Sequence, residues 1–459
     1  MKQKPTRHYR IAYTLFLIPF VLAILSWAYF PTVAQLVTTN IFGHHATTQP
    51  ANLAWLATIE FFYTWYTFVA IAVAGVWITS AFLARKKEVD GKVGFYPMVS
   101  FVVPAFNEET NIAHCVNSLL KCVDKYIGNC EVIVVDDGST DFTYEVAWRA
   151  VQAWKSECKC RVRCKVMRHM INMGKTGALR TGVNSSLGQL IAVVDGDSQW
   201  DSEALRKLVD ALMLNGKKAV TGYIHPQAEG RADFLISFQQ LEYSQGLAID
   251  RCAQSLGNCV LVVPGAIGLY DAEMLRQILV EGEIRSVVED SEITLAIHKR
   301  GASVGYVSEA CSSTDAPVNL RLLWHQRLRW FTGWLHNVLE IHGDLLGVRS
   351  WLSGLLWYGL VFEFVGAFVD LAAVIAFPFL WLFAPDAVNF GLNLIVFAAY
   401  GLLIALVNQA IALKYAYGRF NHDLLLRYTP LYPFLWIINV FARVRSVIAY
   451  LSGSNGKWH

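Results

Sequence analysis

The sequence predicts an α/β domain with a mostly parallel sheet, inserted between N- and C-terminal transmembrane α-helices. Three observations predict this arrangement. Apolar stretches cluster at the two ends of the 459-residue chain, in which only 16% of the residues are charged. In the middle of the chain, short β-branched runs alternate with helical stretches, which is typical of doubly wound sheets. Acidic residues follow three of these runs, at the edge where such a sheet binds its ligands.

Two apolar stretches near the N-terminus, Ile11–Tyr29 and Phe61–Leu83, are each long enough to cross about 30 Å of hydrocarbon. Lysines and arginines flank the pair at residues 2–10 and 85–87. The positive-inside rule places both flanks in the cytosol, so the two spans form a hairpin. A cleaved signal peptide is the alternative, and the second span and the missing small-residue cleavage site argue against it.

Three further apolar stretches lie near the C-terminus. Trp351–Phe383 and Phe390–Tyr415 are long enough to span, and cations behind the second again indicate the cytosol. The last stretch, Leu431–Leu451, contains Arg443 and Arg445, which are costly in a bilayer. Two interpretations stay open for it: a span whose arginines line a polar path, or an interfacial helix whose arginines snorkel.

All nine cysteines lie in the central segment, which fits a reducing compartment. They are Cys115, Cys122, Cys130, Cys158, Cys160, Cys164, Cys252, Cys259 and Cys311. A zinc site at Cys158, Cys160 and Cys164 is disfavoured because their spacing is not that of paired CxxC motifs. We expect free thiols instead.

The predicted strands are Val99–Val103, Glu131–Val135 and Leu190–Val194. The polar residues that follow them are Asn107, Glu108 and Glu109, then Asp136 and Asp137, then Asp195 and Asp197. One Asp pair after a strand is usually turn chemistry, but three acidic strand ends at one edge are harder to explain in that way. Close carboxylates stay ionised more easily beside a cation, so we expect Mg²⁺ or Mn²⁺ at the last aspartates, where it could also hold a diphosphate.

Seven motifs occur in a characteristic order along the chain. They are VVPAFNEE (102–109), VDDGSTD (135–141), NMGKTGAL (172–179), DGDS (195–198), VPGAIGLY (263–270), VEDSEIT (288–294) and QRLRW (326–330). This order resembles the processive inverting family-2 glycosyltransferases, which include the synthases of cellulose, chitin, hyaluronan and poly-N-acetylglucosamine. The resemblance implies a GT-A-type nucleotide-sugar-binding domain, a UDP-sugar donor and a growing polysaccharide as acceptor.

The resemblance also assigns the donor site. Pro104, Phe106 and Glu108 should lie with Asp137 around the nucleoside, Asp137 through the base or ribose. Core packing is the alternative for Pro104 and Phe106. Lys175 is similar to the family lysine near the diphosphate, with a solvated loop cation as its alternative.

Four carboxylates receive roles from the same resemblance. Asp195 and Asp197 form the family's DxD, with Asp197 as the direct metal ligand and Asp195 as a second ligand nearer the ribose. Asp290 of VEDSEIT should be the general base that takes a proton from the acceptor, with Glu289 beside the acceptor. The alternative for Glu289 and Asp290 is a helix N-cap ahead of Ile293–Ile297, which fits the spacing.

In QRLRW, Arg327 and Arg329 should meet the diphosphate, while Trp330 and Gln326 hold the acceptor end. A guanidinium suits a diphosphate, and an indole suits the apolar face of a sugar ring. A basic amphipathic helix lying on anionic lipid is the alternative.

The flanking spans and QRLRW look most like poly-N-acetylglucosamine synthases, although FTGW (331–334) departs from the Ala-Gln-Gly-Gly usual there. We therefore expect polymerisation of N-acetylglucosamine and passage of the polymer across the membrane. The alternatives are a hyaluronan-, chitin- or glucan-type synthase, a non-processive lipid-phosphate glycosyltransferase, or a silent membrane scaffold. A silent scaffold would have no need of the acidic motifs.

The expected organisation is two N-terminal transmembrane helices (1–88), a cytosolic catalytic domain (89–315), amphipathic interface helices carrying QRLRW (316–350) and C-terminal transmembrane helices (351–459). The expected location is the inner or plasma membrane, with several passes. Membrane lipid and an accessory export subunit are expected as partners, and nucleic acid is not.

Overall fold

The structure, a computed structural model, describes residues 72–86, 91–157, 162–228, 234–280, 282, 284–383, 402–403, 405–416 and 423–453. The expected span Ile11–Tyr29, parts of the spans Phe61–Leu83 and Phe390–Tyr415, and Cys158 and Cys160 lie outside these residues. The chain divides into two compact units, 1–82 and 83–459. The described residues of the first unit, 72–82, are helical.

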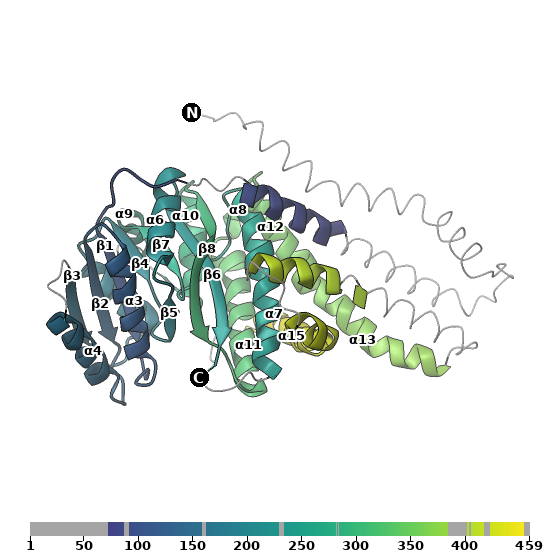
Figure 1. Ribbon diagram of the computed structural model, residues 1–459. Helices are drawn as coiled ribbons and strands as arrows, with labels where there is room; N and C mark the ends of the chain where they lie inside the picture. Colours follow the sequence, from purple (N-terminus) through teal and green to yellow (C-terminus); the bar gives the residue numbers. More distant parts are fainter. Residues whose placement is uncertain are drawn as a thin grey trace. The chain divides into compact units, whose positions relative to one another are not determined.

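The second unit is built on an eight-stranded sheet with the order β3-β2-β1-β4-β7-β6-β8-β5 (Figure 1). The strands are β1 (Val99–Ala105), β2 (Cys130–Asp136), β3 (Val162–Arg168), β4 (Leu190–Val193), β5 (Ser198–Trp200), β6 (Ala219–Gln227), β7 (Gly268–Asp271) and β8 (Val304–Asp315). The three strands predicted from the sequence correspond to β1, β2 and β4. Every residue of these three strands is buried, as expected for strands covered on both faces.

The first half of the sheet is parallel. In the paired register, Val99 of β1 lies opposite Cys130 of β2 and Leu190 of β4. The carboxyl ends of these strands therefore meet at one edge, as the sequence predicted. This edge carries the acidic residues.

The second half of the sheet corrects the expectation of a mostly parallel sheet. β7 runs antiparallel to both β4 and β6, β5 runs antiparallel to β8, and β6 and β8 are parallel, so the sheet is mixed. Because β7 starts opposite the end of β4, the loop before β7 reaches the acidic edge. The backbone N–H of Asp195 donates to the carbonyl of Gly265 in that loop, at 2.9 Å.

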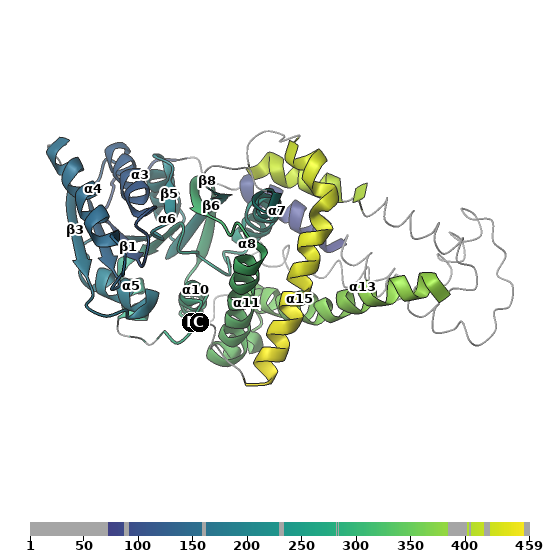
Figure 2. The same cartoon turned by 90° about the horizontal axis from the view of Figure 1, so that it is seen from below.

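Helices cover both faces of the sheet. They are α3 (Ile112–Lys125), α4 (Thr143–Glu157), α5 (Gly174–Asn184), α6 (Ala204–Leu214), α7 (Phe234–Tyr243), α8 (Cys252–Leu256), α9 (Ala272–Leu279) and α10 (Glu289–Lys299). Figure 2 shows α3 and α4 on one face of the parallel half and α5 on the other. Two of these helices begin at the acidic edge, α5 at Gly174 and α10 at Glu289, so Lys175 and Asp290 each lie in a first helical turn.

A group of longer helices follows the sheet. They are α11 (Leu320–His336), α12 (Trp351–Tyr358), α13 (Gly366–Phe383) and α15 (Tyr432–Leu451), with the π-helical segment η5 (Gly359–Val365) between α12 and α13. Another π-helical segment, η2 (Ser244–Arg251), joins α7 to α8. In both views α11 lies between α10 and α15, and α7 packs beside it (Figures 1 and 2). Among the described residues, two helical segments, 351–372 and 424–451, are long and apolar enough to cross a membrane.

Candidate active site

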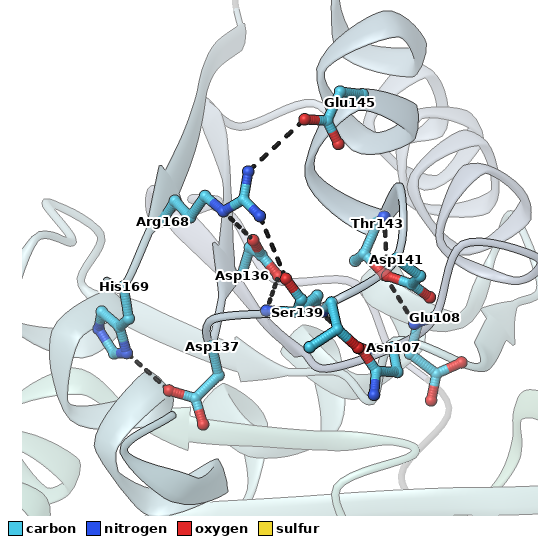
Figure 3. Close-up of polar contacts among 11 residues, drawn as sticks. Asn107, Glu108, Asp136, Asp137, Ser139, Asp141, Thr143, Glu145, Arg168 and His169 are labelled. Atoms are coloured by element: carbon cyan, nitrogen blue, oxygen red, sulfur yellow. Dashed lines mark hydrogen bonds and ion pairs between the residues drawn. The ribbon is translucent and has the colours of Figure 1, made fainter. Parts of the chain in front are cut away.

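Hydrogen bonds tie the loop after β1 to the loop after β2 (Figure 3). The backbone N–H of Asn107 donates to Ser139 Oγ at 2.9 Å, and that of Glu108 donates to Thr143 Oγ1 at 2.7 Å. In return, Asn107 Oδ1 accepts from the backbone N–H of Thr140. Asn107 has a φ of 56°, a left-handed conformation that Asn tolerates better than most residues. The chain's own hydrogen bonds therefore join the two loops at this edge of the sheet.

The two adjacent aspartates after β2 have different surroundings. Asp136 is fully buried, and its Oδ2 lies 3.1 Å from Nε of Arg168, so it supports the loop (Figure 3). Asp137 is 2% exposed, and its Oδ1 contacts His169 Nδ1 at 2.7 Å and accepts from the backbone N–H of Met173 at 2.9 Å. The sequence did not single out His169, which holds Asp137 from the end of β3.

The residues expected around the nucleoside differ from one another in their exposure to solvent. Pro104 is buried in β1, as the core-packing alternative expects. Phe106 is 45% exposed at the same edge, where its ring is free to stack on a ligand. Burial, together with the carboxylates of Asp315, Asp195 and Asp141, raises the pKa of Glu108. The edge thus concentrates negative charge.

Lys175 joins three of the sequence motifs. Its Nζ lies 2.7 Å from Asp195 Oδ1, after β4, and 2.9 Å from Glu289 Oε1, at the start of α10. Partial burial opposes the charge on Lys175, but Asp195, Glu289 and Asp290 outweigh it and raise its pKa well above its ordinary value. The solvated-loop alternative is therefore wrong for Lys175. DGDS, GKTG and VEDSEIT, far apart in sequence, meet at one ammonium group.

Gly265 packs directly against this ion pair. A Cβ at this position would lie 2.7 Å from Lys175 Nζ and equally close to Asp195 Oδ2. Cβ atoms essentially never approach other atoms so closely, so any side chain at this position would have to displace the ends of Lys175 and Asp195. The sequence showed Gly265 only as part of VPGAIGLY; its contact with Asp195 depends on the antiparallel β7.

Asp197 lies near the carboxylates of Asp195 and Glu108. Its Oδ1 accepts from the hydroxyls of Ser198 and Thr314, both at 3.1 Å. Burial, followed by the carboxylates of Asp195 and Glu108, raises the pKa of Asp197 to about 7. A cation at this place would relieve that repulsion, and carboxylate oxygens are the ligands that Mg²⁺ and Mn²⁺ prefer. The donor set therefore fits the expected metal.

The protein side chains alone do not form a complete metal centre. Within the described residues, no group of three or more His, Cys, Asp or Glu side chains has a metal-binding arrangement. A metal at Asp197 would thus need ligand oxygens from a bound diphosphate or from water. The seven cysteines in the described part of the chain are free thiols, as the sequence predicted.

The helix α10 begins with the two acidic residues of VEDSEIT. Val288 is its N-cap residue, and no side chain caps the helix there. Glu289 and Asp290 occupy the first helical positions, so the N-cap alternative is wrong for both. Burial opposes ionisation of Glu289, but the Lys175 ammonium outweighs it and lowers the Glu289 pKa.

Asp290 has the chemistry of a proton acceptor. Its Oδ1 accepts from the backbone N–H of Ser291 at 2.7 Å, which fixes the carboxylate. Burial and the adjacent Glu289 carboxylate raise the pKa of Asp290 to about 6. A raised pKa gives a carboxylate more basicity while it remains mostly ionised at neutral pH.

The two arginines of QRLRW differ in burial: on α11, Arg327 is buried and Arg329 is exposed. Arg327 is only 1% exposed, and its Nη2 pairs with Glu242 Oε2 of α7 at 2.5 Å. Arg329 is exposed and near enough to Glu289 to contribute to its lowered pKa. The expectation that both arginines meet the diphosphate is corrected for Arg327, because its guanidinium is buried in an ion pair with Glu242.

Trp330 and Gln326 are half-buried on the same helix. The guanidinium carbon of Arg327 lies 4.4 Å from the centre of a Trp330 ring, and Arg327 Nη1 donates to Gln326 Oε1 at 3.3 Å. Arg327 is thus in contact with both expected acceptor residues. Glu289, the third of them, is engaged with Lys175.

Comparison with known proteins shows which proteins this chain resembles. Residues 100–278 match the family described as Glycosyl transferase family 2, and residues 190–411 match Glycosyl transferase family group 2. A solved mannosyltransferase from Pyrobaculum calidifontis, in complex with GDP-Man and Mn²⁺, has a TM-score of 0.60 at 16% identity and covers 86% of this chain and 100% of its own. At this identity the likeness shows the fold. The chain has a GT-A-like fold with a mixed sheet.

More particularly, the chain is similar to curated N-acetylglucosamine transferases and polymer synthases. It is 28% identical over 242 residues to an N-acetylglucosaminyltransferase of Azorhizobium caulinodans, covering 51% of this chain and 59% of that protein. It is 25% identical over 242 residues to a poly-beta-1,6-N-acetyl-D-glucosamine synthase of Staphylococcus epidermidis, covering 52% and 55%. The chain thus spans a little over half the length of these relatives.

Proposed function

We propose that this chain is a membrane-embedded processive glycosyltransferase that polymerises N-acetylglucosamine from a UDP-sugar by inverting transfer. The observation that carries the proposal is the pair of Lys175 contacts to Asp195 and Glu289, next to Asp290. These contacts bring Asp195, in the expected metal and diphosphate site, close to Glu289 and the expected base Asp290. Such a juxtaposition is what one displacement at an anomeric carbon requires.

In the proposed reaction, Asp290 accepts the proton of the acceptor hydroxyl. The hydroxyl oxygen forms the new bond to the anomeric carbon while the bond to the diphosphate oxygen breaks, and UDP leaves. One displacement inverts the configuration at that carbon. The pKa of about 6 keeps Asp290 ionised at neutral pH, ready to take the proton.

The donor would lie along the acidic edge. Phe106, Glu108 and Asp137 would surround the nucleoside, with Asp137 held in one orientation by its contact with His169 at 2.7 Å. Pro104 would contribute only through the shape of β1. Lys175 would exchange a carboxylate contact for the diphosphate when the donor binds.

Mg²⁺ or Mn²⁺ would be held by Asp197 and Asp195 and would stabilise negative charge on the leaving diphosphate. Arg329 would add a second cation at the diphosphate, since it is exposed and close to Glu289. Arg327 is left out of this role because of its ion pair with Glu242.

The acceptor end would lie against Trp330, with Gln326 and Glu289 beside it. The exposed indole surface offers a sugar ring an apolar face. The names of the relatives from Azorhizobium caulinodans and Staphylococcus epidermidis support N-acetylglucosamine as the sugar and its polymer as the product. Hyaluronan-, chitin- or glucan-type synthesis and non-processive transfer to a lipid phosphate would use the same chemistry.

We further propose the membrane arrangement expected from the sequence. The domain 89–315 would be cytosolic, between transmembrane helices in 1–88 and 351–459, with 316–350 at the interface and the polymer passing across the inner or plasma membrane. The apolar helical segments 351–372 and 424–451 support it by length and composition. Membrane lipid and an accessory export subunit would be partners, and nucleic acid would not.

The test is a donor screen on the full-length protein in lipid nanodiscs. UDP-N-acetylglucosamine, UDP-glucose, UDP-glucuronate and UDP-galactose would each be supplied with Mg²⁺ or Mn²⁺, and any polymer digested with linkage-specific glycosidases. We expect polymer from UDP-N-acetylglucosamine alone. Polymer from another donor would overturn the sugar, and single transfer to lipid phosphate would overturn processivity.

Asp290→Asn tests the base in the same assay. Loss of the proton acceptor is expected to lower polymer synthesis about 10³-fold, within the range for a positioned general base. UDP affinity, measured by calorimetry, should stay within about twofold because Asp290 takes no part in nucleotide binding. Normal synthesis by this variant would disprove the assignment.

A further inference from the structure

The buried face of α11 is attached to two other helices through one carboxylate. Oε2 of Glu242, in α7, forms an ion pair with Arg327 Nη2 at 2.5 Å. Its Oε1 accepts a hydrogen bond from Asn439 Nδ2, in α15, at 2.9 Å. Asn439 is 4% exposed and Arg327 is 1% exposed. We call Glu242, Arg327 and Asn439 the Glu242 cluster.

The Glu242 cluster contacts the indole of Trp330 in the QRLRW motif through Arg327. The Arg327 guanidinium lies 4.4 Å from the Trp330 ring centre, the arrangement of a cation–π contact. Because Glu242 holds the guanidinium in one place, it also limits the positions that the indole can take. The order of contacts is Asn439 to Glu242, Glu242 to Arg327, and Arg327 to Trp330.

A second contact attaches the same side of α15 to α11. Arg443, one turn after Asn439, pairs through Nη2 with Glu363 Oε2 at 2.7 Å. Its guanidinium carbon lies 4.9 Å from the ring centre of Phe331, the neighbour of Trp330. Asn439 and Arg443, four residues apart on α15, thus contact residues of α7, α11 and η5. Arg443 is occupied by protein groups.

We infer that Glu242 and Asn439 are positioning residues for the acceptor site, and that α15 acts as a support that fixes the orientation of Trp330. This inference rests on the proposed acceptor role of Trp330. A buried arginine requires a charged partner, and Glu242 supplies it. The planar guanidinium, held by Glu242, then presents its face to the indole, which a lysine ammonium cannot do.

The first arm of the test observes Trp330 itself and needs no substrate. The full-length protein is labelled with 5-fluorotryptophan, and the Trp330 ¹⁹F resonance is identified by its loss in Trp330→Phe. We expect this resonance to shift or broaden in Glu242→Gln, Asn439→Leu and Arg327→Lys. It should not change in Ser446→Ala, the control in α15, because the Ser446 hydroxyl bonds within its own helix to the Ala442 carbonyl at 2.7 Å. An unchanged Trp330 signal in Asn439→Leu and Arg327→Lys would overturn the inference.

The second arm measures catalysis with UDP-N-acetylglucosamine. Asn439→Leu is expected to lower polymer elongation about tenfold, the effect of losing one hydrogen bond to a charged group. UDP release by donor hydrolysis should remain within about twofold, which also shows that the variant is folded. Equal loss of both activities would overturn the inference.

Arg327→Lys separates orientation from simple charge neutralisation. Lysine keeps the charge opposite Glu242 but lacks the planar group that stacks on Trp330. Elongation as impaired as in Asn439→Leu supports the inference, whereas normal elongation overturns it. Normal elongation by Trp330→Ala would instead contradict the proposed function, and the ¹⁹F result would still decide whether the Glu242 cluster orients the indole.

Discussion

Adjacent carboxylates in this site differ through their surroundings. Asp136 and Asp137 follow the same strand, yet Asp136 is paired with Arg168 and Asp137 with His169. Glu289 and Asp290 are also neighbours, and Lys175 lowers the pKa of Glu289 while burial raises that of Asp290. Paired carboxylates whose pKa values move apart are a common sign of acid–base assignment, and here the raised member is the proposed base.

The pH dependence of the reaction should follow Asp290. Its pKa is raised to about 6, so below that pH the carboxyl is protonated and cannot accept a proton. We expect kcat/KM to increase with pH through about 6 and then to level off, since kcat/KM reports the free enzyme. The measurement is initial polymer synthesis from about pH 5 to about pH 8, with UDP affinity followed over the same range as the control. A flat profile with constant UDP affinity would contradict the assignment.

Gly265 is expected to tolerate no side chain. In Gly265→Ala the new Cβ would overlap Lys175 Nζ and the Asp195 carboxylate and force that ion pair apart. A loss of about 1–3 kcal/mol of transition-state stabilisation corresponds to a fall in donor kcat/KM of about 5- to 150-fold, which is the range that we expect. Gly94→Ala is the matched control, because nothing lies within 4 Å of a Cβ built there. Wild-type kcat/KM in both variants would show that catalysis does not depend on the close packing of Gly265.

At the scale of elements, the sequence predicted what depends on local pattern. β1, β2 and β4 are continuous buried apolar runs, and each was found within two residues of its observed ends. β5 and β7 have only three and four residues, too few for a pattern, so their antiparallel pairing was missed. The contact of Gly265 with Asp195 was missed for the same reason.

The sequence predicted a helix at QRLRW, and α11 is that helix. It did not predict which residues of QRLRW contact one another. Gln326, Arg327 and Trp330 form one contact group, although the sequence had grouped Arg327 with Arg329. The partner that buries Arg327, Glu242, lies 85 positions earlier in the chain, and Asn439 is 197 positions from Glu242. No local pattern could reveal a cluster that only the packing of α7, α11 and α15 creates.

Trp330→Ala should separate the two activities of the enzyme. The proposed function assigns the indole to the acceptor and the Asp195–Lys175 contact to the donor, so removal of the indole should impair acceptor binding and leave the donor in place. We expect elongation to fall about tenfold or more, in line with the loss of an aromatic platform for a sugar ring, and donor hydrolysis to stay within about twofold. Release of labelled UDP without acceptor and the length of the polymer are measured side by side. Equal loss of both would argue against an acceptor site at Trp330.

At the scale of the whole molecule, the proposed function requires the donor and the product to be on opposite sides of a membrane. Nucleotide sugars are cytosolic, and the basic flanks at residues 2–10 and 85–87 indicate the same side for the catalytic domain. The cysteine usage agrees, since the described cysteines are free thiols. The position of α15 against α11 adds that at least one C-terminal helix packs directly on the helix of the acceptor motif (Figure 2).

The topology predicts a difference in chemical access. Glu309 is a largely exposed side chain of the catalytic domain, so Glu309→Cys should react with a membrane-impermeant maleimide only after the cells are permeabilised. Thr38→Cys, in the loop expected between the first two spans, should react in intact cells and is the matched control. The unmodified protein gives the background of its native cysteines, most of which are buried in the described part. Labelling of Glu309→Cys in intact cells would place the catalytic domain outside, where no nucleotide sugar could reach it, and would contradict the proposed function.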